Sequence, residues 1–453
     1  MPFEETLSLL DSPQINWKYV TAVLLVAQYV FETCLEFRQC RFLESLRGSG
    51  SIQKEIHHEK EKENEQAYAV AKVKFSMVSK TLVLLRWLIT IRLELYLKLW
   101  MLSGYFTMSS SGIFPSWIND SGFAHSFVFV SVIQVLAFCF HLPLDYYEHF
   151  VLEETYGVNK QTIGRFVLNT VKTTGVSLVA ISTVTAWFLE SLADVGYKYY
   201  CYLGYVILGA NVTFATLVPA LVAPFVNKFR PLADSQLKTA IETLTAGEKF
   251  PLAKIHMDHV HETNRRSNWS YYSAVYFIGV PWSKQLILYD VLTEYCTTDE
   301  IVALTAYVIG LWKMNHSVMK ILAMPVSTLW VLSLYLACIH NKSLYTSFGF
   351  ANEQPFLIGC LLFMDVWSAL ESFPKFVLNL ASRYFVHEAD KFVKDKGYLD
   401  KLCSLLLKFS EGETTSKTKV DWAYSTLHNA EPLLSERFSA LGYGSEEESD
   451  KYD

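Results

Sequence analysis

The stretch F-A-H-S-F-V-F-V-S-V-I-Q-V-L-A-F-C-F-H-L-P-L, residues 123–144, contains no Asp, Glu, Lys or Arg. Such a run is long enough to cross the hydrocarbon core of a bilayer, which takes about 20 apolar residues in a helix. Residues 199–227 and 321–340 are equally free of charge, and 173–189 is nearly so. Residues 15–35 carry one late charge, Glu32, and are predicted to form the first span. The chain is therefore predicted to cross a membrane several times.

Two further apolar runs contain charged residues. Residues 81–105 include Arg86, Arg92, Glu94 and Lys98, and residues 355–370 include Asp365. Charged side chains at membrane depth normally face the interior of a helix bundle or water. With these two runs, the sequence predicts seven transmembrane helices.

The composition supports the membrane class and excludes others. Of the 453 residues, 51% are hydrophobic and 15% aromatic, which is more apolar than an average soluble domain. The net charge of -6 argues against a nucleic-acid binder, because such affinity depends on neutralising phosphates. The eight cysteines are scattered without a C-x-x-C pair, so neither a disulfide framework nor a cysteine metal site is predicted. The acidic final residues E-E-E-S-D-K-Y-D contain no prenylation box.

Flanking charges predict the orientation. The residues before the first span are acidic, whereas Arg38, Arg41, Arg47 and several lysines follow it. The positive-inside rule then places the N-terminus in the lumen and, after seven crossings, the C-terminus in the cytosol.

Five segments, in order along the chain, resemble landmarks of the type I CAAX prenyl protease, an integral membrane zinc metallopeptidase. They are F-E-T-C-L-E-F-R-Q-C-R (31–41), F-V-L-E-E-T-Y-G-V-N-K-Q-T (150–162), L-K-T-A-I-E-T-L-T-A-G-E-K-F-P-L-A-K-I (237–255), L-N-L-A-S-R-Y-F (378–385) and P-L-L-S-E-R-F-S-A-L-G (432–442). The resemblance implies seven transmembrane helices that form an α-barrel around a chamber. A gluzincin-like peptidase domain with a small β-sheet would cap this barrel.

The resemblance also implies a division into two domains. Residues 1–227 correspond to the N-terminal membrane region with five spans. Residues 228–453 correspond to the zinc-peptidase-type domain and include the two further spans, 321–340 and 355–370.

The metal site of that family does not match this sequence. The family's H-E-x-x-H places two zinc ligands one helical turn apart and a glutamate base between them. The family's W-K-x-x-H follows that motif and is present here as W-K-M-N-H (312–316), so the motif positions hold Tyr307, Val308 and Leu311. Val386 stands where the family has its third ligand, a glutamate, although Asp390, which in the family supports a ligand histidine, is present.

Two other family positions also differ. The stretch that in the family pairs with the substrate backbone and carries H-S-N-A-Y here contains Trp269, Ser270, Tyr271 and Tyr272. Glu431 replaces a histidine that stabilises the reaction intermediate in the family. The family uses one zinc ion, but these substitutions predict that this chain binds none.

Four residues offer an alternative metal site. His259 and His261 would project from one face of a strand, and His387 and Glu388 follow the lost ligand position. One residue along a helix is a rotation of about 100° and two are about 200°, so His387 and Glu388 would point away from that position.

Three functions remain open. The first is a pseudoprotease that binds prenylated or amphipathic C-termini, or that pairs with an active paralogue. The second is an active zinc metalloendopeptidase of CAAX-box processing with a rebuilt site, and the third is a lipid-binding or structural membrane protein. The family implies the endoplasmic reticulum membrane, with the inner nuclear membrane as a further location; membrane lipid is an expected partner and nucleic acid is not.

Overall fold

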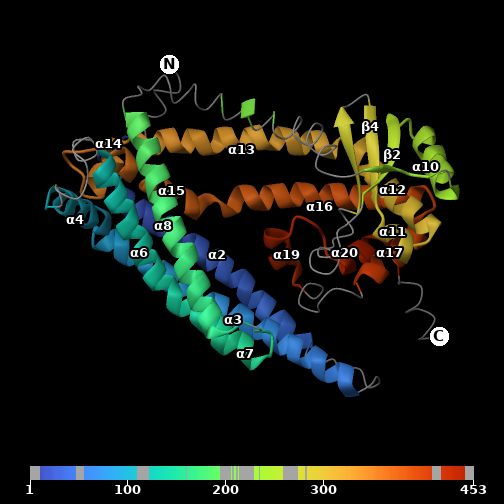
Figure 1. The fold of residues 1–453 in the computed structure, drawn as a ribbon, viewed down its shortest axis with the longest axis horizontal. Coiled ribbons are helices and arrows are strands. Elements are labelled where there is room, and N and C mark those ends of the chain that lie inside the picture. The colour runs from blue at the N-terminus through green and yellow to red at the C-terminus, as the bar shows by residue number, and fades with distance from the viewer. Residues whose placement is uncertain are drawn as a thin grey trace. The chain divides into compact units, whose positions relative to one another are not determined.

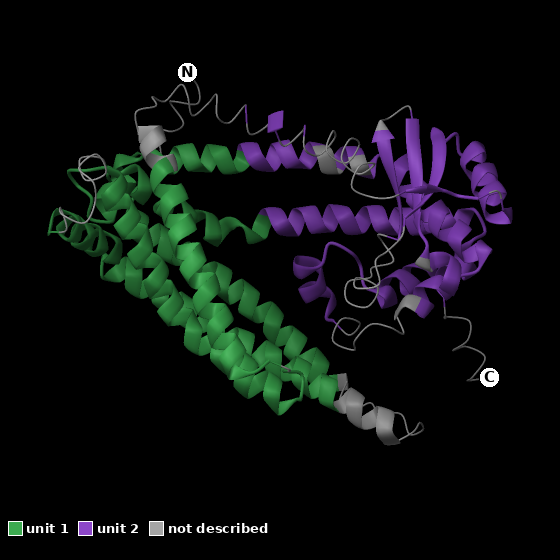
Figure 2. Ribbon diagram, in the orientation of Figure 1, with its two compact units in different colours: residues 1–204, 330–373 green, residues 205–329, 374–453 purple. Residues whose placement is uncertain are grey.

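The computed structural model consists mainly of long helices, with one small β-sheet (Figure 1). It describes residues 11–46, 56–109, 122–159, 161–193, 206, 209–210, 213, 229–233, 235–258, 274–280, 283–410 and 420–443. The chain forms two compact units (Figure 2). Unit 1 comprises residues 1–204 and 330–373, and unit 2 comprises residues 205–329 and 374–453.

Among its described residues, unit 1 contains helices and the turns that connect them, but no strand. Its elements are α2 (Trp17–Leu46), α3 (Ile56–Arg92), α4 (Leu95–Ser109), α6 (Gly122–Tyr147), the π-helical turn η1 (Glu148–Leu152), α7 (Glu153–Thr155), α8 (Ile163–Ala193), α14 (Lys342–Ser347) and α15 (Phe356–Leu370). The division between the units falls within α13 (His316–Ile339) and α16 (Ser372–Asp395).

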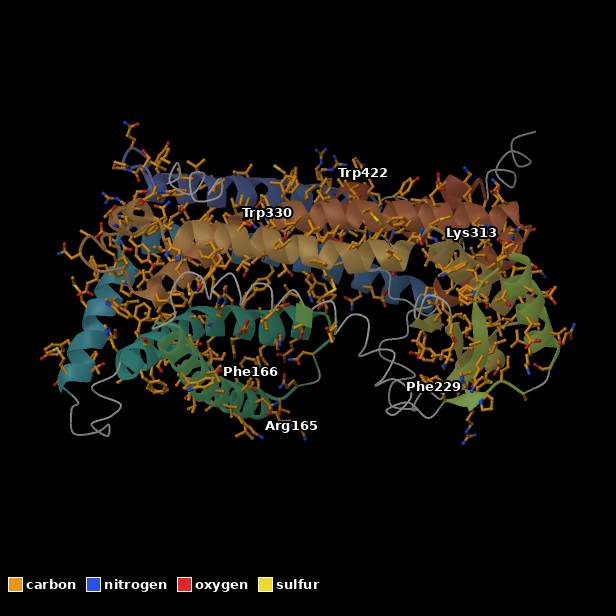
Figure 3. All side chains as sticks on the ribbon, turned by 90° about the horizontal axis from the view of Figure 1, so that it is seen from above. Arg165, Phe166, Phe229, Lys313, Trp330 and Trp422 are labelled. Atoms are coloured by element: carbon orange, nitrogen blue, oxygen red, sulfur yellow. The ribbon has the colours of Figure 1, made fainter. Side chains whose placement is uncertain are left out.

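The described residues contain four helices that are long and apolar enough to cross a membrane, at Trp17–Ser45, Gly122–Thr155, Ile163–Trp187 and Leu322–Ile339. α15 and α16, which meet at a bend of 45°, provide a fifth if the pair counts as one span. Large apolar side chains on these helices face outward, such as Trp330 on α13 (Figure 3). This arrangement is expected where the solvent is lipid. The chain is thus a multi-pass membrane protein, although the described spans do not reach the predicted seven, and most of 199–227 lies outside the described residues.

The prediction of one continuous span over 81–105 differs from the structure. α3 ends at Arg92 and α4 begins at Leu95, and Glu94 between them has a positive φ of 52°. A left-handed residue interrupts helical hydrogen bonding, so the chain turns at this point. Lys18 Nζ on α2 binds Glu94 Oε1 at 2.6 Å and holds the turn. Arg92 and Glu94, two of the charged residues in the run 81–105, lie at the break between α3 and α4.

Asp365, the charge in the last predicted span, lies in the apolar core of unit 1. Only 1% of its surface is exposed, and Tyr96 Oη on α4 donates a hydrogen bond to its Oδ1 at 3.1 Å. The same helix is closely packed at Gly359, where an added Cβ would lie 2.1 Å from Tyr345 Oη. The carboxyl group therefore faces the helix bundle, as expected for an ionisable residue within a span.

Unit 2 combines a mixed four-stranded sheet with helices. Its elements, besides most of α16 and the first part of α13, are β1 (Arg230–Pro231), α10 (Gln236–Gly247), β2 (Leu252–Asp258), β3 (Val275–Val280), β4 (Ser283–Tyr289), α11 (Val291–Tyr295), α12 (Thr298–Lys313), α17 (Leu399–Ser410), α19 (Trp422–His428) and α20 (Leu434–Leu441). The strand order is β1-β2-β4-β3, with β2 and β4 parallel and the other pairs antiparallel. The small β-sheet expected from the resemblance is confirmed.

The first turn of α12 fixes the helix that carries the family's metal positions. Thr297 and Glu300 form a capping box, in which Glu300 Oε2 accepts from the Thr297 backbone N at 2.8 Å. The buried Glu300 carboxylate also accepts from Ser404 Oγ (2.7 Å) and Lys408 Nζ (2.8 Å) on α17. Burial alone would raise the pKa of Glu300, but these donors hold it down to about 2.

Glu300→Gln should lower the stability of unit 2 by about 2 kcal/mol near neutral pH, because hydrogen bonds to a buried charge are lost. A carboxylate with a depressed pKa contributes stability above its unfolded pKa and loses it as pH falls towards the folded value. The difference in thermal midpoint between wild type and variant in detergent should therefore shrink between about pH 5 and pH 2. An unchanged difference over that range would contradict the assignment.

Candidate functional site: a degenerate metal centre

The family's first metal motif falls on the buried face of α12. Tyr307 and Val308 belong to the hydrophobic core of unit 2, and Leu311 packs against that core. Gly310, between them, allows α16 to approach, since an added Cβ would lie 3.1 Å from Phe392 Cδ1 and 3.4 Å from Ala389 Cα. At its C-terminal end the helix is anchored by Lys313 Nζ, which binds Glu248 Oε2 at 2.7 Å (Figure 3). The positions predicted from the W-K-M-N-H landmark thus face the core.

The family's third ligand position and its supporting aspartate lie on α16. Val386 is buried in the same hydrophobic core as Tyr307. Asp390, one turn further along, is 1% exposed and forms a bidentate ion pair with the fully buried Arg437 of α20, where Arg437 Nε donates to Asp390 Oδ2 at 2.7 Å. The guanidinium carbon also lies 5.1 Å from the centre of the Tyr307 ring. α12, α16 and α20 therefore meet at one buried centre.

The residues at this centre do not fit a zinc ion. Zinc sites in proteins use cysteine sulfur, histidine nitrogen or carboxylate oxygen, usually from four ligands. Two of the three family ligand positions are aliphatic, Leu311 and Val386, and the third is the phenol of Tyr307. The one carboxylate nearby, Asp390, is held by Arg437. Within the described parts of the chain, no group of three or more His, Cys, Asp and Glu residues could hold a metal ion.

The alternative metal residues receive no support as a cluster. His387 and Glu388 are half-buried on α16, and His387 Nδ1 has no hydrogen-bond partner among the described residues. His259 and His261 lie outside the described residues, as do Trp269, Ser270, Tyr271 and Tyr272. The strand that follows them, β3, is at an edge of the sheet, with Val275 paired to Leu288 of β4.

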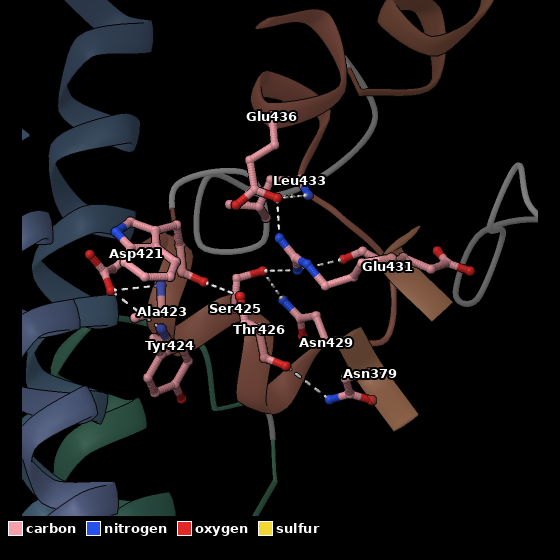
Figure 4. Close-up of polar contacts among 12 residues, drawn as sticks. Asn379, Asp421, Ala423, Tyr424, Ser425, Thr426, Asn429, Glu431, Leu433 and Glu436 are labelled. Carbon is pink, nitrogen blue, oxygen red and sulfur yellow. Dashed lines mark hydrogen bonds and ion pairs between the residues drawn. The ribbon is translucent and has the colours of Figure 1, made fainter. Parts of the chain in front are cut away.

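Glu431 lies in the segment between α19 and α20, where the family has its histidine. Its backbone carbonyl accepts a hydrogen bond from Arg383 Nη1 at 3.3 Å. Arg383 also donates to Ser425 Oγ at 3.1 Å and pairs with Glu436 of α20 (Figure 4). Asn379 Nδ2 donates to the carbonyls of Thr426 (3.2 Å) and Leu427 (2.7 Å). This network fixes the segment around Glu431.

No motif in the sequence predicted these contacts, although the spacing of the residues contains a signal. Asn379, Arg383, Asp390 and Lys394 recur at intervals of four, seven and four, which places them on one face of a helix. Lys394 Nζ completes the set by donating to the Leu441 carbonyl at 2.7 Å. A polar stripe of this kind predicts a helix face that binds a polar partner. The partner is residues 420–443 of the same chain.

Comparison with known proteins agrees with this geometry. Residues 44–228 match the model "CAAX prenyl protease N-terminal, five membrane helices", and residues 231–444 match "Peptidase family M48". CAAX prenyl protease 1 of Saccharomyces cerevisiae is 32% identical over 97% of this chain and 98% of its own length. The chain belongs to the CAAX prenyl protease 1 family.

Two further relatives show how far the family likeness extends. The human CAAX prenyl protease 1 homolog is 28% identical over 76% of this chain and 78% of its own length. The crystal structure of S. mikatae Ste24p matches with a TM-score of 0.65 at 30% identity and covers 95% of this chain and 100% of that one. The predicted family and helical membrane fold are thus confirmed. Within this family of zinc peptidases, Tyr307, Leu311 and Val386 occupy the positions that the W-K-M-N-H and S-R-Y-F landmarks predict for the metal ligands.

Substitutions at the Asp390–Arg437 pair should be strongly non-additive. Asp390→Leu or Arg437→Met alone leaves an uncompensated buried charge and should cost about 3–5 kcal/mol, whereas the double variant should cost less than either. Thermal midpoints in detergent measure the cycle. As a control, Lys401→Met removes an exposed pair with Asp299 (3.7 Å) and should change little. Additive costs would show that the pair is not coupled.

Proposed function

We propose that this chain is a catalytically inactive CAAX prenyl protease homologue that binds prenylated or otherwise amphipathic protein C-termini. The observation that carries the proposal is the apolar core formed by Val308, Leu311 and Val386 at the positions of the catalytic base and two ligands. Peptide hydrolysis by this family depends on a metal-activated water and a base beside it. Neither valine nor leucine can ligate zinc or accept a proton.

The retained scaffold supports binding as the remaining role. The match to S. mikatae Ste24p covers 95% of this chain, and its landmark helices α12, α16 and α20 still pack together. Replacing the metal ligands by core residues would remove catalysis, whereas the packing that maintains the fold would be kept. We propose that the chain sequesters prenylated C-termini or associates with an active paralogue.

The placement in the cell and the domain organisation belong to this proposal. We propose residence in the endoplasmic reticulum membrane, and also in the inner nuclear membrane, with a luminal N-terminus and a cytosolic C-terminus. The excess of Lys and Arg after the first span supports this orientation. Residues 1–227 would form the membrane region and 228–453 the degenerate peptidase-type region, with seven crossings in all.

The purified chain should contain no stoichiometric zinc and should leave a farnesylated CAAX peptide uncleaved, while a photoactivatable farnesyl peptide labels it. Elemental analysis, product analysis by mass spectrometry and labelling measure these outcomes, with the S. cerevisiae relative as the positive control. One equivalent of zinc together with cleavage would refute inactivity. His387→Ala and Glu388→Ala would then show whether a rebuilt site is responsible. Labelling by farnesyl lipid irrespective of the peptide would favour a lipid-binding role.

Restoring the family residues provides the complementary test. Tyr307→His, Val308→Glu, Leu311→His and Val386→Glu together should confer zinc binding, because α12 and α16 already bring these positions to one core. A version that keeps Val308 should bind zinc without cleaving peptide, since it lacks the base. Expression in cells without the active protease measures complementation. Failure of the full variant to bind zinc would show that the scaffold no longer supports the metal site.

A further inference from the structure

A charged cluster lies between α2 and α3 in unit 1, far along the sequence from the metal positions. Lys80 Nζ on α3 lies 2.8 Å from Glu32 Oε2 and 2.9 Å from Glu36 Oε1, both on α2. Ser76 Oγ donates to Glu36 Oε1 at 2.7 Å. Glu32 and Glu36 fall within the candidate span Trp17–Ser45. Ionisable groups at such depth are costly and commonly mark ion or proton sites.

The cluster contains two carboxylates and one ammonium group. Glu32 Oε1 is satisfied by neutral donors, Ser372 Oγ at 2.9 Å and Gln28 Nε2 at 3.1 Å. Glu36 is different: its side chain is 3% exposed, and its Oε2 has no hydrogen-bond partner among the described residues. One negative charge is thus left over, and it is located at a buried, unpaired oxygen.

A second oxygen is available on the same face of α2. Thr33 Oγ1 is buried and also has no partner within the described part of the chain. Residues three apart on a helix are neighbours, so Thr33 and Glu36 occupy adjacent positions on the surface of α2. Thr33 takes no part in the contact between Glu32 and Lys80. Its hydroxyl, which has no partner among the described residues, is therefore a second and separate indication of a bound ligand.

Other charges around the cluster are already engaged or face elsewhere. Lys74 of α3 pairs with Glu44 at 2.8 Å, and the Arg41 guanidinium lies over the Phe37 ring. Arg38 is exposed and lies about 200° around the helix from Glu36. Two other helices, α14 and α15, also pack on α2. On α15 the buried carboxyl of Asp365 accepts from Tyr96, and on α14 the exposed Lys342 lies next to Ser343, which accepts from Trp17 at the start of α2. None of these groups offsets the charge of Glu36.

We propose that Glu36 Oε2 and Thr33 Oγ1 bind one exchangeable monovalent cation, with Glu32 and Lys80 holding Glu36 in position. The cation is a proton or a sodium ion, since either neutralises the remaining charge and needs only oxygen partners. Glu36 shares its one lysine partner with Glu32, so its buried charge is incompletely neutralised and the folded state gains stability when the cation binds.

The test measures the thermal midpoint of the full chain in detergent in two series. One replaces choline by sodium at constant ionic strength and pH, and the other varies pH from 5.5 to 8.5 at constant sodium. The midpoint should rise by about 2–4 °C with sodium if sodium is the ligand, or as pH falls if the proton is. Glu36→Gln should abolish that response and raise the midpoint where the cation is scarce.

Two further variants complete the design. Glu44→Gln removes an exposed carboxylate from the same pair of helices and should respond as wild type does. Thr33→Val keeps every charge but removes the second oxygen, so it should shift the response to higher cation concentration. The proposal is overturned if wild type responds in neither series, if Glu36→Gln responds as wild type does, or if Glu44→Gln loses the response.

Discussion

The buried ion pair between Asp390 and Arg437 is the contact on which the peptidase-type unit depends. Both side chains are almost completely excluded from solvent, so each would be a severe cost without the other. The pair joins α16 to α20, and the guanidinium also faces Tyr307 of α12. Three segments that are far apart in sequence are thereby brought into one core.

Other polar contacts of α16 also hold the C-terminal residues 425–441 against this helix. Asn379, Arg383 and Lys394 bind the backbone or side chains of residues 425–441, on the helix face that carries Asp390. Buried polar groups of this kind add specificity because any other register would leave them unsatisfied. The segment that contains Glu431 is therefore fixed in place although the histidine of the family is absent. A fixed binding surface is what a non-catalytic homologue would retain.

The sequence was sufficient for the family and the membrane class, because each depends on local patterns, whereas the positions of the lost ligands stay a prediction. Uncharged runs report helices long enough for a bilayer, and W-K-M-N-H gives the register of α12. The break at Glu94 and the partner of Asp390 were not predictable in this way. The first depends on a single left-handed residue held by Lys18, and the second joins residues 47 positions apart. In the sequence Asp390 was left without a ligand to support, whereas in the fold Arg437 is its partner.

The substitutions at the metal positions have a consequence for stability as well as for chemistry. A catalytic metal site keeps polar ligands and an open coordination position inside a protein, and both oppose close packing. Replacing histidine and glutamate by Leu311, Val308 and Val386 converts that region into ordinary hydrophobic core. Each buried aliphatic side chain contributes about 1.5–3 kcal/mol of transfer free energy. Under the function proposed above, side-chain packing thus takes the place of the metal site. Asp390 and Glu36, two of the charged residues that the chain buries, are then places where a remaining function would constrain the sequence.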